Sequence, residues 1–347
     1  MNRVTKNIIA NYMGKLWGFV SIFIFVRFYI DLLGIESYAI INFYAVILGL
    51  LVFADGGLTA TLTRELARDI PLLEKSNLVY TLERIYVAIC IAIIIVILFS
   101  ADIISHNFLN SKHYPPNEIA YYIRLMGVGV AFQLFSTLYD GGLQGLQYQV
   151  LTNKIKITWG IFRSGIVLIP LYFYPRLEIY FWWQIVCNIV LVLVFRSNLY
   201  NLLLKDKLFF STQLLKSNYK YALGMMGIAF ISAINIQIDK IVTSKYLSAE
   251  LFGYYSIASI LSQIPIMVVI PIVIAVFPLL SQYVSQNDTE AIIKNFHKYS
   301  FTITLVAAPL AFCIAWYSVP LVTLWTGMPK AAQVVDYVVK MLVIGGF

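Results

Sequence analysis

The 347-residue sequence has few charged side chains: Asp, Glu, Lys and Arg make up 12% of it, against 60% hydrophobic residues. A soluble fold of this length needs far more polar surface, so soluble classes are excluded. Disorder is excluded too, because 23 Phe and 24 Tyr at low charge density describe a chain that must bury apolar surface. An integral membrane protein remains.

Cysteine and histidine are equally scarce, with three residues of each. Each cysteine falls inside an apolar run, which predicts buried free thiols instead of a disulfide framework or metal cluster: Cys90, Cys187 and Cys313. We expect His106 and His113 in one outer loop and His297 in an inner loop, as solvated side chains. The motifs GxxxxGK[ST], HExxH and GxSxG are absent, so we expect no enzyme, no metal and no cofactor.

Apolar runs of about 20 residues recur along the chain, each long enough to cross a bilayer core of about 30 Å as a helix. The last run begins near residue 334 and stops with the chain at Phe347. The predicted helices cover 8–31, 38–62, 85–105, 121–142, 157–175, 179–197, 222–244, 252–278, 299–318 and the run from 334.

The basic residues between these runs predict the topology. Fifteen Lys and Arg fall in loops on the side of the N-terminus, and four fall on the other side. The positive-inside rule therefore places the N-terminus in the cytoplasm. The net charge of +8 is spread between apolar runs without forming a basic face, so nucleic acid is not an expected partner.

A short repeat divides the sequence. LGIESYAIINFY (Leu33–Tyr44) resembles LSAELFGYYSIA (Leu247–Ala258) at an offset of 214 residues, with Glu36 matching Glu250. The copies lie six helices apart, which predicts two parallel repeats: an N-terminal six-helix lobe with a cytoplasmic linker over 1–214, and a C-terminal lobe over 215–347. Two full copies need roughly 80 more residues, so we expect a twelve-helix design that is shortened in its tenth helix.

A second short sequence occurs twice, at the predicted cytoplasmic ends of two helices: Asp55-Gly56-Gly57-Leu58 and Asp140-Gly141-Gly142-Leu143. Glycine pairs let neighbouring helices or a turn approach closely. Asp55 and Asp140 are therefore candidates for coupling or gating contacts, with ordinary helix ends as the alternative.

Ionisable residues inside predicted spans usually face a cavity and mark a functional site. Arg163 is the strongest candidate, because it lies about seven residues into its helix. Arg27 lies near the outer end of its helix, where it can bind substrate, pair with Asp31 or snorkel. Lys240 is a third candidate cation, and Asp239 beside it can carry a coupling proton or balance a cation.

Polar residues at helical spacing accompany these charges on several helices. One such stripe by itself is explained by hydrogen bonding between helices, whereas several together favour a central wet cavity. The stripes include Ser232, Asn235 and Asp239, and Gln133, Ser136 and Asp140.

The run over 252–278 contains three prolines, Pro265, Pro271 and Pro278. A proline removes a backbone hydrogen bond and bends a helix, and such breaks often lie at transporter hinges. We interpret Pro265 and Pro271 as hinge candidates, with a static bend as the alternative.

Several stretches together resemble a Wzx-type O-antigen or polysaccharide flippase of the multidrug/oligosaccharidyl-lipid/polysaccharide exporter superfamily. They are LGIESYAIINFYAVILGLLVFADGGLTATLTRELAR, QGLQ, QIDKIVTSKYLSAELFGYYSIAS and PLVTLWTG. The resemblance covers essentially the whole chain. It implies an all-α polytopic fold with two pseudo-symmetric lobes in a V around a central cavity, located in the cell inner (cytoplasmic) membrane.

The resemblance also implies a cargo, undecaprenyl-pyrophosphate-linked repeat units carried from the cytoplasmic to the periplasmic leaflet by alternating access. Arg163, Arg27 and Lys240 would then lower the cost of moving an anionic headgroup through a low-dielectric region. The implied partners are this lipid-linked oligosaccharide, membrane lipid and other polysaccharide assembly proteins.

Three alternatives stay open. A drug or cation exporter of the same superfamily would be expected to present acidic cavity residues, whereas the deep charges here are mostly positive. A polysaccharide polymerase or glycosyltransferase would bring a long outer loop or a soluble domain. The third is a truncated flippase that inserts without transporting.

Overall fold

The computed structural model describes residues 3–204, 208–210, 212–286 and 288–346. These residues are almost entirely helical, and within them the only β-type pairing is an isolated bridge between Asn110 and Ser248. The expected all-α fold is therefore confirmed.

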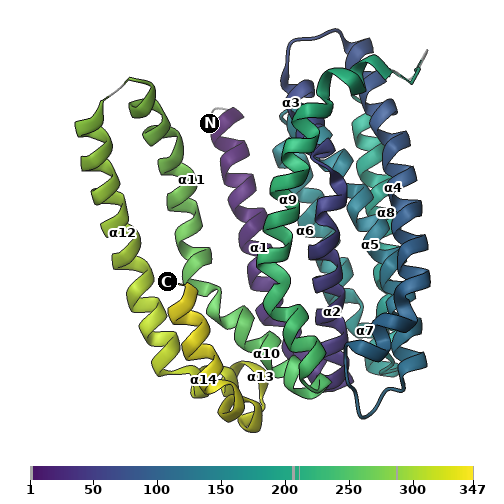
Figure 1. Cartoon of the computed structure of the whole chain (residues 1–347), viewed down its shortest axis with the longest axis vertical. Helices are drawn as coiled ribbons and strands as arrows, with labels where there is room; N and C mark the ends of the chain where they lie inside the picture. Colours follow the sequence, from purple (N-terminus) through teal and green to yellow (C-terminus); the bar gives the residue numbers. More distant parts are fainter. Residues whose placement is uncertain (1–2, 205–207, 211, 287, 347) are drawn as a thin grey trace. The chain divides into compact units, whose positions relative to one another are not determined.

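The helices follow one another with short connections (Figure 1). They are α1 (Arg3–Leu33), α2 (Ile35–Leu51), η1 (Val52–Asp55), α3 (Leu58–Ala67), α4 (Leu72–Asn107), α5 (Pro116–Gly145), α6 (Gln149–Gly160), η2 (Ile161–Ile166), α7 (Leu168–Phe173), α8 (Leu177–Tyr200), α9 (Thr212–Tyr246), α10 (Ala249–Ser262), α11 (Ile264–Ser285), α12 (Thr289–Trp316), α13 (Ser318–Thr326) and α14 (Pro329–Gly346).

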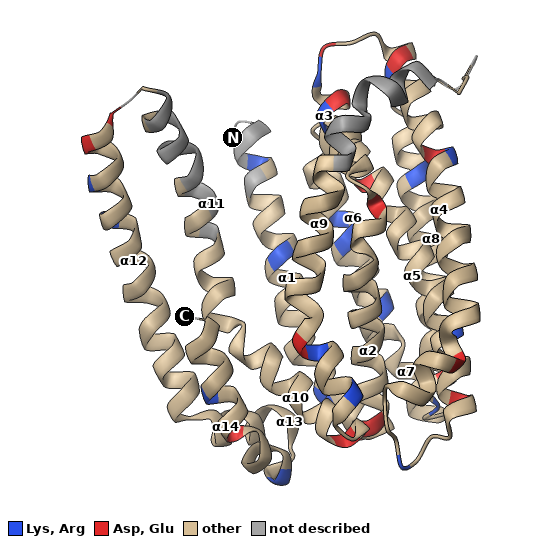
Figure 2. Cartoon of the chain, viewed as in Figure 1, with Lys and Arg blue, Asp and Glu red and all other residues tan. Residues whose placement is uncertain are grey.

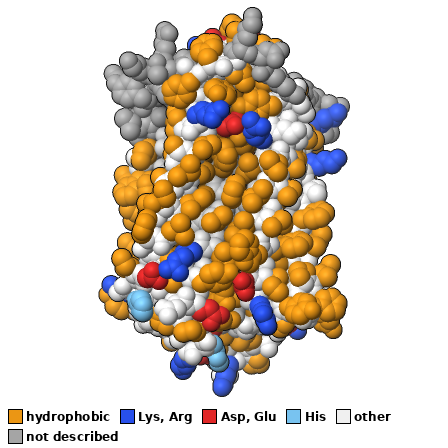
Figure 3. Space-filling view, turned by 90° about the vertical axis from the view of Figure 1, so that its right-hand side faces the viewer, with side chains coloured by type: hydrophobic (Ala, Val, Ile, Leu, Met, Phe, Trp, Pro, Cys, Tyr) orange, Lys and Arg blue, Asp and Glu red, His pale blue; other side chains and the backbone are white. Residues whose placement is uncertain are grey.

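Nine helical segments within the described ranges are long and apolar enough to cross a membrane. Each overlaps one of the first nine predicted runs, and the run from 334 lies in α14. Charged residues concentrate towards the helix ends (Figure 2). On one face of the molecule, hydrophobic side chains form a broad belt between two charged ends (Figure 3). The protein is therefore a multi-pass membrane protein.

Two compact units divide the chain, Met1–Glu250 and Leu251–Phe347. In the first, α5 packs against α4, α8, α3 and α2, and α9 packs against α2, η1 and α3. In the second, α12 packs against α11 and α14, and α13 packs against α14. The predicted lobe boundary at 214/215 was derived from the sequence repeat, whereas these units are defined by their compactness. The lobe boundary stays a prediction.

The repeat is visible in the helix bounds. The starts of α2 and α10 lie 214 residues apart, so Glu36 and Glu250 are each the second residue of their helix. Glu36 is 7% exposed, and its carboxylate accepts hydrogen bonds from the backbone N–H groups of Lys112 at 3.1 Å and His113 at 3.2 Å. An acidic residue in the first helical turn is also favoured by the helix dipole. Glu36 thus fixes the connection between α4 and α5 to the start of α2.

The two Asp-Gly-Gly-Leu sequences adopt different structures. Gly56 and Gly57 have φ angles of 57° and 69°, so the first glycine pair makes the left-handed turn between η1 and α3. The second pair lies inside α5, where the Gly141 carbonyl accepts a hydrogen bond from Thr63 Oγ1 at 2.9 Å. A Cβ on nearby Gly145 would stand 2.6 Å from the Thr63 carbonyl oxygen. Glycine there serves close packing of α5 on α3.

Three predicted helices are interrupted. The run over 38–62 is divided into α2, η1 and the start of α3, with the turn at Gly56 and Gly57 between η1 and α3. The run over 252–278 breaks between Ser262 and Ile264, and Pro265 is the second residue of α11. Proline is tolerated in a first helical turn because that N–H has no helical partner. The run over 157–175 is divided into the end of α6, the segment η2 and the short helix α7.

The thiol prediction holds in part. Cys90 and Cys187 are buried and free as expected, but the expectation is wrong for Cys313, whose side chain is exposed on α12. An apolar run fixes membrane depth without fixing whether a side chain faces lipid or protein, which explains the difference.

Replacing Gly145 by Ala should destabilise the first unit. The added methyl group would meet the Thr63 backbone, which cannot move as a flexible side chain can, and overpacking of this kind costs about 1–3 kcal/mol. Thermal unfolding in detergent measures the loss. Gly18→Ala is the matched control, because nothing lies within 4 Å of its added Cβ. A Gly145→Ala protein as stable as the control variant would contradict the close α3–α5 packing.

Candidate functional site

Arg163 lies on η2, a π-helical segment in the middle of the span Gln149–Phe173. Pro170 has no N–H to offer the carbonyl of Ile166, four residues earlier, so regular α-helical bonding cannot continue through this point. Gly165 lies close to α1: a Cβ added to this glycine would lie 3.2 Å from the ring of Phe25. Single π-helical turns inside α-helices are frequent at functional sites.

The guanidinium of Arg163 is held by neutral groups. Its Nε donates a hydrogen bond to Gln184 Oε1, and Gln184 Nε2 donates one to the Arg163 carbonyl oxygen at 3.3 Å. Gln184 is 1% exposed, which fixes its amide in place. The guanidinium carbon lies 4.8 Å from the ring centroid of Trp159 and 5.9 Å from that of Tyr44, so two aromatic rings add cation–π stabilisation.

Further polar side chains continue from this arginine into the first unit. Tyr44 Oη donates to Gln133 Oε1 at 3.1 Å, and Asn188 Nδ2 lies 3.2 Å from Tyr44 Oη and 2.8 Å from the Gly129 carbonyl oxygen. Asn188 Oδ1 is buried and has no hydrogen-bond partner among the described residues. We call Arg163, Gln184, Asn188, Tyr44 and Gln133 the Arg163 cluster; it joins η2, α8, α2 and α5.

The cluster carries an uncompensated positive charge. Within the described part of the chain, no carboxylate forms an ion pair with Arg163. The terminal nitrogens of Arg163, Nη1 and Nη2, donate no hydrogen bond to a described residue. The edge of the guanidinium that they form is therefore available to a ligand. The side chain is half-buried, where a charge interacts more strongly than in water. This arrangement favours an anion with two adjacent oxygen atoms, such as a phosphate or a carboxylate.

The other candidate cations lie outside this cluster. Arg27 forms an ion pair with Asp31 at 3.7 Å on its own helix, which was one of the three alternatives, and both side chains are more than half exposed. Lys240 is half-buried on α9, and its carbonyl oxygen and that of Asp239 both accept from Thr243 Oγ1. α9 packs against α2 and η1, so Asp239 and Lys240 belong to the first unit by packing.

Asp55 and Asp140 make local contacts at helix ends. The Asp55 carboxylate accepts from Thr59 N–H at 3.2 Å and from the Thr59 hydroxyl, which caps the start of α3. Asp140 Oδ2 lies 2.6 Å from Lys156 Nζ and accepts from Gln144 Nε2 at 2.8 Å. Lys156 lies on α6, so this ion pair links α5 to α6.

Of the hinge candidates, Pro265 is buried at the break between α10 and α11. Pro271 lies on the backbone of α11, and its side chain lies outside the described residues.

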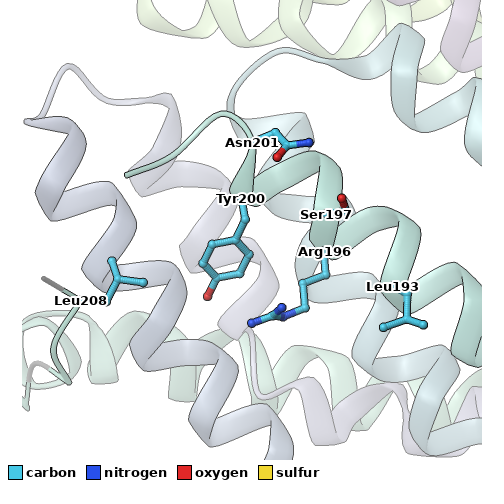
Figure 4. A pocket seen from close by; sticks show the side chains of 6 residues that line it. All are labelled: Leu193, Arg196, Ser197, Tyr200, Asn201 and Leu208. Atoms are coloured by element: carbon cyan, nitrogen blue, oxygen red, sulfur yellow. The ribbon is translucent and has the colours of Figure 1, made fainter. Parts of the chain in front are cut away.

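A second arginine lines a pocket of about 610 Å³ at the end of α8 (Figure 4). Arg196 Nη2 lies 3.2 Å from Glu83 Oε1, and its guanidinium carbon lies 4.7 Å from the ring centroid of Tyr200. Tyr200 Oη also donates to Glu83 Oε2, at 2.5 Å. Glu83 of α4 therefore neutralises Arg196, and this arginine joins α4 to α8 instead of offering its charge to a ligand.

Sequence reasoning missed part of the Arg163 cluster. Gln184 and Asn188 are spaced four residues apart within an apolar run, which is the pattern of one polar helix face and could have identified them. No sequence signal reveals the pairing of Arg196 with Glu83, because the two residues are 113 positions apart.

The fold is that of membrane transporters. It is similar to an inward-facing multidrug resistance MATE family transporter of the MOP superfamily (TM-score 0.69, 15% identity, covering 99% of this chain and 82% of that one). It is also similar to the lipid II flippase MurJ in an inward closed conformation (TM-score 0.65, 14% identity, 98% and 72%). A MATE in complex with MaL6 gives a TM-score of 0.65 at 15% identity, covering 98% and 80%.

The sequence assigns the family. The model of the polysaccharide biosynthesis protein family matches residues 4–284, and the chain belongs to that family. No curated protein matches the sequence. The resemblance to polysaccharide flippases is thereby confirmed at the level of family and of superfamily fold.

The Asp140–Lys156 pair should stabilise the contact between α5 and α6. A double-mutant cycle with Asp140→Asn and Lys156→Met should give a coupling energy of about 0.5 kcal/mol or more in thermal or chemical unfolding, because Lys156→Met leaves a mostly buried carboxylate uncompensated. The same cycle on Arg27 and Asp31, which are longer in separation and more exposed, should give a value near zero. Equal coupling in both cycles would contradict a structural role for the first pair.

Proposed function

We propose that this protein moves an anionic lipid-linked oligosaccharide between the leaflets of the inner membrane. The cargo in this proposal is an undecaprenyl-pyrophosphate-linked O-antigen or polysaccharide repeat unit, carried from the cytoplasmic to the periplasmic leaflet by alternating access. The excess of loop cations on the side of the N-terminus supports a cytoplasmic N-terminus. Membership of the polysaccharide biosynthesis protein family supports the saccharide cargo.

One observation carries the proposal: Arg163 presents the unbonded edge of a guanidinium at the middle of a membrane span. A pyrophosphate loses its hydration when it enters a low-dielectric region, and that loss is the main barrier to its crossing. A guanidinium edge binds phosphate oxygens through two parallel hydrogen bonds and supplies a charge that does not titrate. Arg163 would therefore lower the barrier where it is highest.

The other candidates receive subordinate roles. Arg27 and Lys240 would contact the headgroup near the outer end of the path, since both lie towards the outer ends of their helices. Asp239 would carry a coupling proton or balance a cation. Asp55 and Asp140 would stabilise one conformation from helix ends, and Pro265 and Pro271 would bend the α10–α11 segment during the change of access.

The competing proposal is a drug or cation exporter, because one MATE neighbour is named a multidrug resistance transporter. At 15% identity these neighbours support the fold alone. A cationic drug needs a carboxylate or an aromatic cage in place of a bare guanidinium, so the Arg163 cluster favours an anionic cargo.

Replacing Arg163 should abolish export while leaving the protein in the membrane. In a strain lacking its own flippase, wild-type protein should restore surface polysaccharide, and Arg163→Ala should lower it at least about tenfold through loss of phosphate binding. Arg163→Lys should restore part of it, because the charge returns without the two-pronged geometry. Arg84→Ala removes an exposed arginine of α4 and should export normally. Normal polysaccharide from Arg163→Ala at equal membrane levels would overturn the proposal.

Gln184→Glu should remove the available charge of Arg163 without impairing the folding of the protein. A carboxylate at this position would form an ion pair with Arg163 in nearly the same geometry, so the melting temperature should be kept or raised while export falls. Surface polysaccharide and detergent melting curves, measured on the same preparations, provide the test. Full export by Gln184→Glu would show that the Arg163 charge need not be available.

A further inference from the structure

A second pocket of about 510 Å³ lies between α6 and α8 in the first unit. One wall runs from Leu151 to Phe162, and the other runs from Trp183 to Val194. Each wall covers eleven residue steps, so the pocket extends about 16 Å along the helices, roughly half of a hydrocarbon core of about 30 Å. We call it the α6–α8 groove. Its volume lies in the range of specific ligand sites.

The groove is open along its length. On the α8 wall, Val186, Val190 and Val194 are 54%, 51% and 38% exposed, which shows that no other part of the described chain closes it. A long, narrow slot with an open side fits an extended hydrocarbon chain better than a compact solute. Its surroundings are the apolar belt of a membrane-spanning bundle, so the ligand reaches it from the lipid.

Lys154 is the one charged residue of the groove lining. It lies at the end of α6 nearer the N-terminal side of the membrane, its side chain is exposed, and no carboxylate among the described residues pairs with it. At the other end, the indole N–H groups of Trp159 and Trp183 already donate to the carbonyl oxygens of Cys187 and Phe162. The groove therefore has one cationic end and one apolar end.

The groove adjoins the Arg163 cluster. Trp159 lines the groove and also stacks against the Arg163 guanidinium at 4.8 Å. Lys154 and Arg163 are nine residues apart on the same span, about 13 Å along its axis. A headgroup bound at Lys154 would thus lie at the start of a path that leads to Arg163.

We propose that the α6–α8 groove binds the hydrocarbon chain of the lipid-linked substrate, with Lys154 holding its phosphate at the membrane surface. This inference rests on the proposed function. A polyprenyl phosphate has one chain joined to its phosphate, which matches a single slot with a single cation at its end. A glycerophospholipid has two chains and a bulkier connection, and it fits this slot less well.

Photolabelling tests the groove directly. The purified 347-residue chain is placed in phosphatidylcholine nanodiscs with a long-chain polyprenyl phosphate that carries a diazirine on its chain, and labelled peptides are mapped after irradiation. Label should concentrate on residues 151–162 and 183–194. Val190→Trp fills the groove and should reduce this labelling about tenfold, whereas Val96→Trp, an exposed valine of α4, should leave it unchanged. Label spread evenly over all exposed spans would overturn the inference.

The phosphate contact has its own test. Lys154→Gln should weaken binding of the same polyprenyl phosphate about fivefold, the effect expected of one lysine near a membrane surface. Lys294→Gln, which removes an exposed lysine of the second unit, should not change it. Phosphatidylglycerol should compete poorly; equal competition would assign the groove to membrane phospholipid and overturn the inference.

These outcomes are independent of the outcome for transport. Labelling needs no flipping, so Arg163→Ala should lose export and keep its labelled groove. Loss of export in Arg163→Ala together with unlabelled groove peptides in the wild-type protein would refute the groove and leave the proposed function intact. Groove labelling in a protein that fails to restore polysaccharide would support lipid binding and refute transport.

Discussion

An arginine charge in the middle of a membrane span, without an acidic partner among the described residues, is the constraint on which the site depends. The cost of such a charge is offset here by a glutamine amide and two aromatic rings, all of which are neutral. A carboxylate would stabilise Arg163 more strongly but would also occupy the edge to which the proposed cargo's phosphate would bind. The neutral partners of the Arg163 cluster stabilise the charge without neutralising it. A site that binds and releases an anion requires both properties.

The surrounding helices make this arrangement rigid. α5 is buried on most sides and packs closely on α3 through Gly145, while α8 places Gln184 and Asn188 against η2 and α2. The remaining charges are used differently: Arg196 is neutralised by Glu83, and Asp140 by Lys156. The first unit thus contains structural ion pairs as well as Arg163, which no described carboxylate neutralises, and the difference between these charges lies in their partners.

Much of the fold follows from composition, because a spanning segment must be a continuous apolar helix. The nine spans, the Arg27–Asp31 pair and the depth of Arg163 could all be predicted from spacing. The pairing of Arg163 with Gln184 and that of Lys156 with Asp140 could not, since each depends on which residues distant in sequence meet. The exposure of Cys313 shows the same limit: hydropathy gives depth in the membrane and leaves the direction of a side chain open.

Transbilayer movement in vesicles tests the central claim most directly. Purified protein would be reconstituted into liposomes with a polyprenyl-diphosphate-linked oligosaccharide, and the fraction accessible to an external, membrane-impermeant sugar-modifying reagent would be followed over time. The account predicts that the protein exposes the inner-leaflet substrate and that a short-chain isoprenyl diphosphate competes, whereas the corresponding uncharged alcohol does not. Movement no faster than in protein-free vesicles, or equal competition by the alcohol, would contradict it.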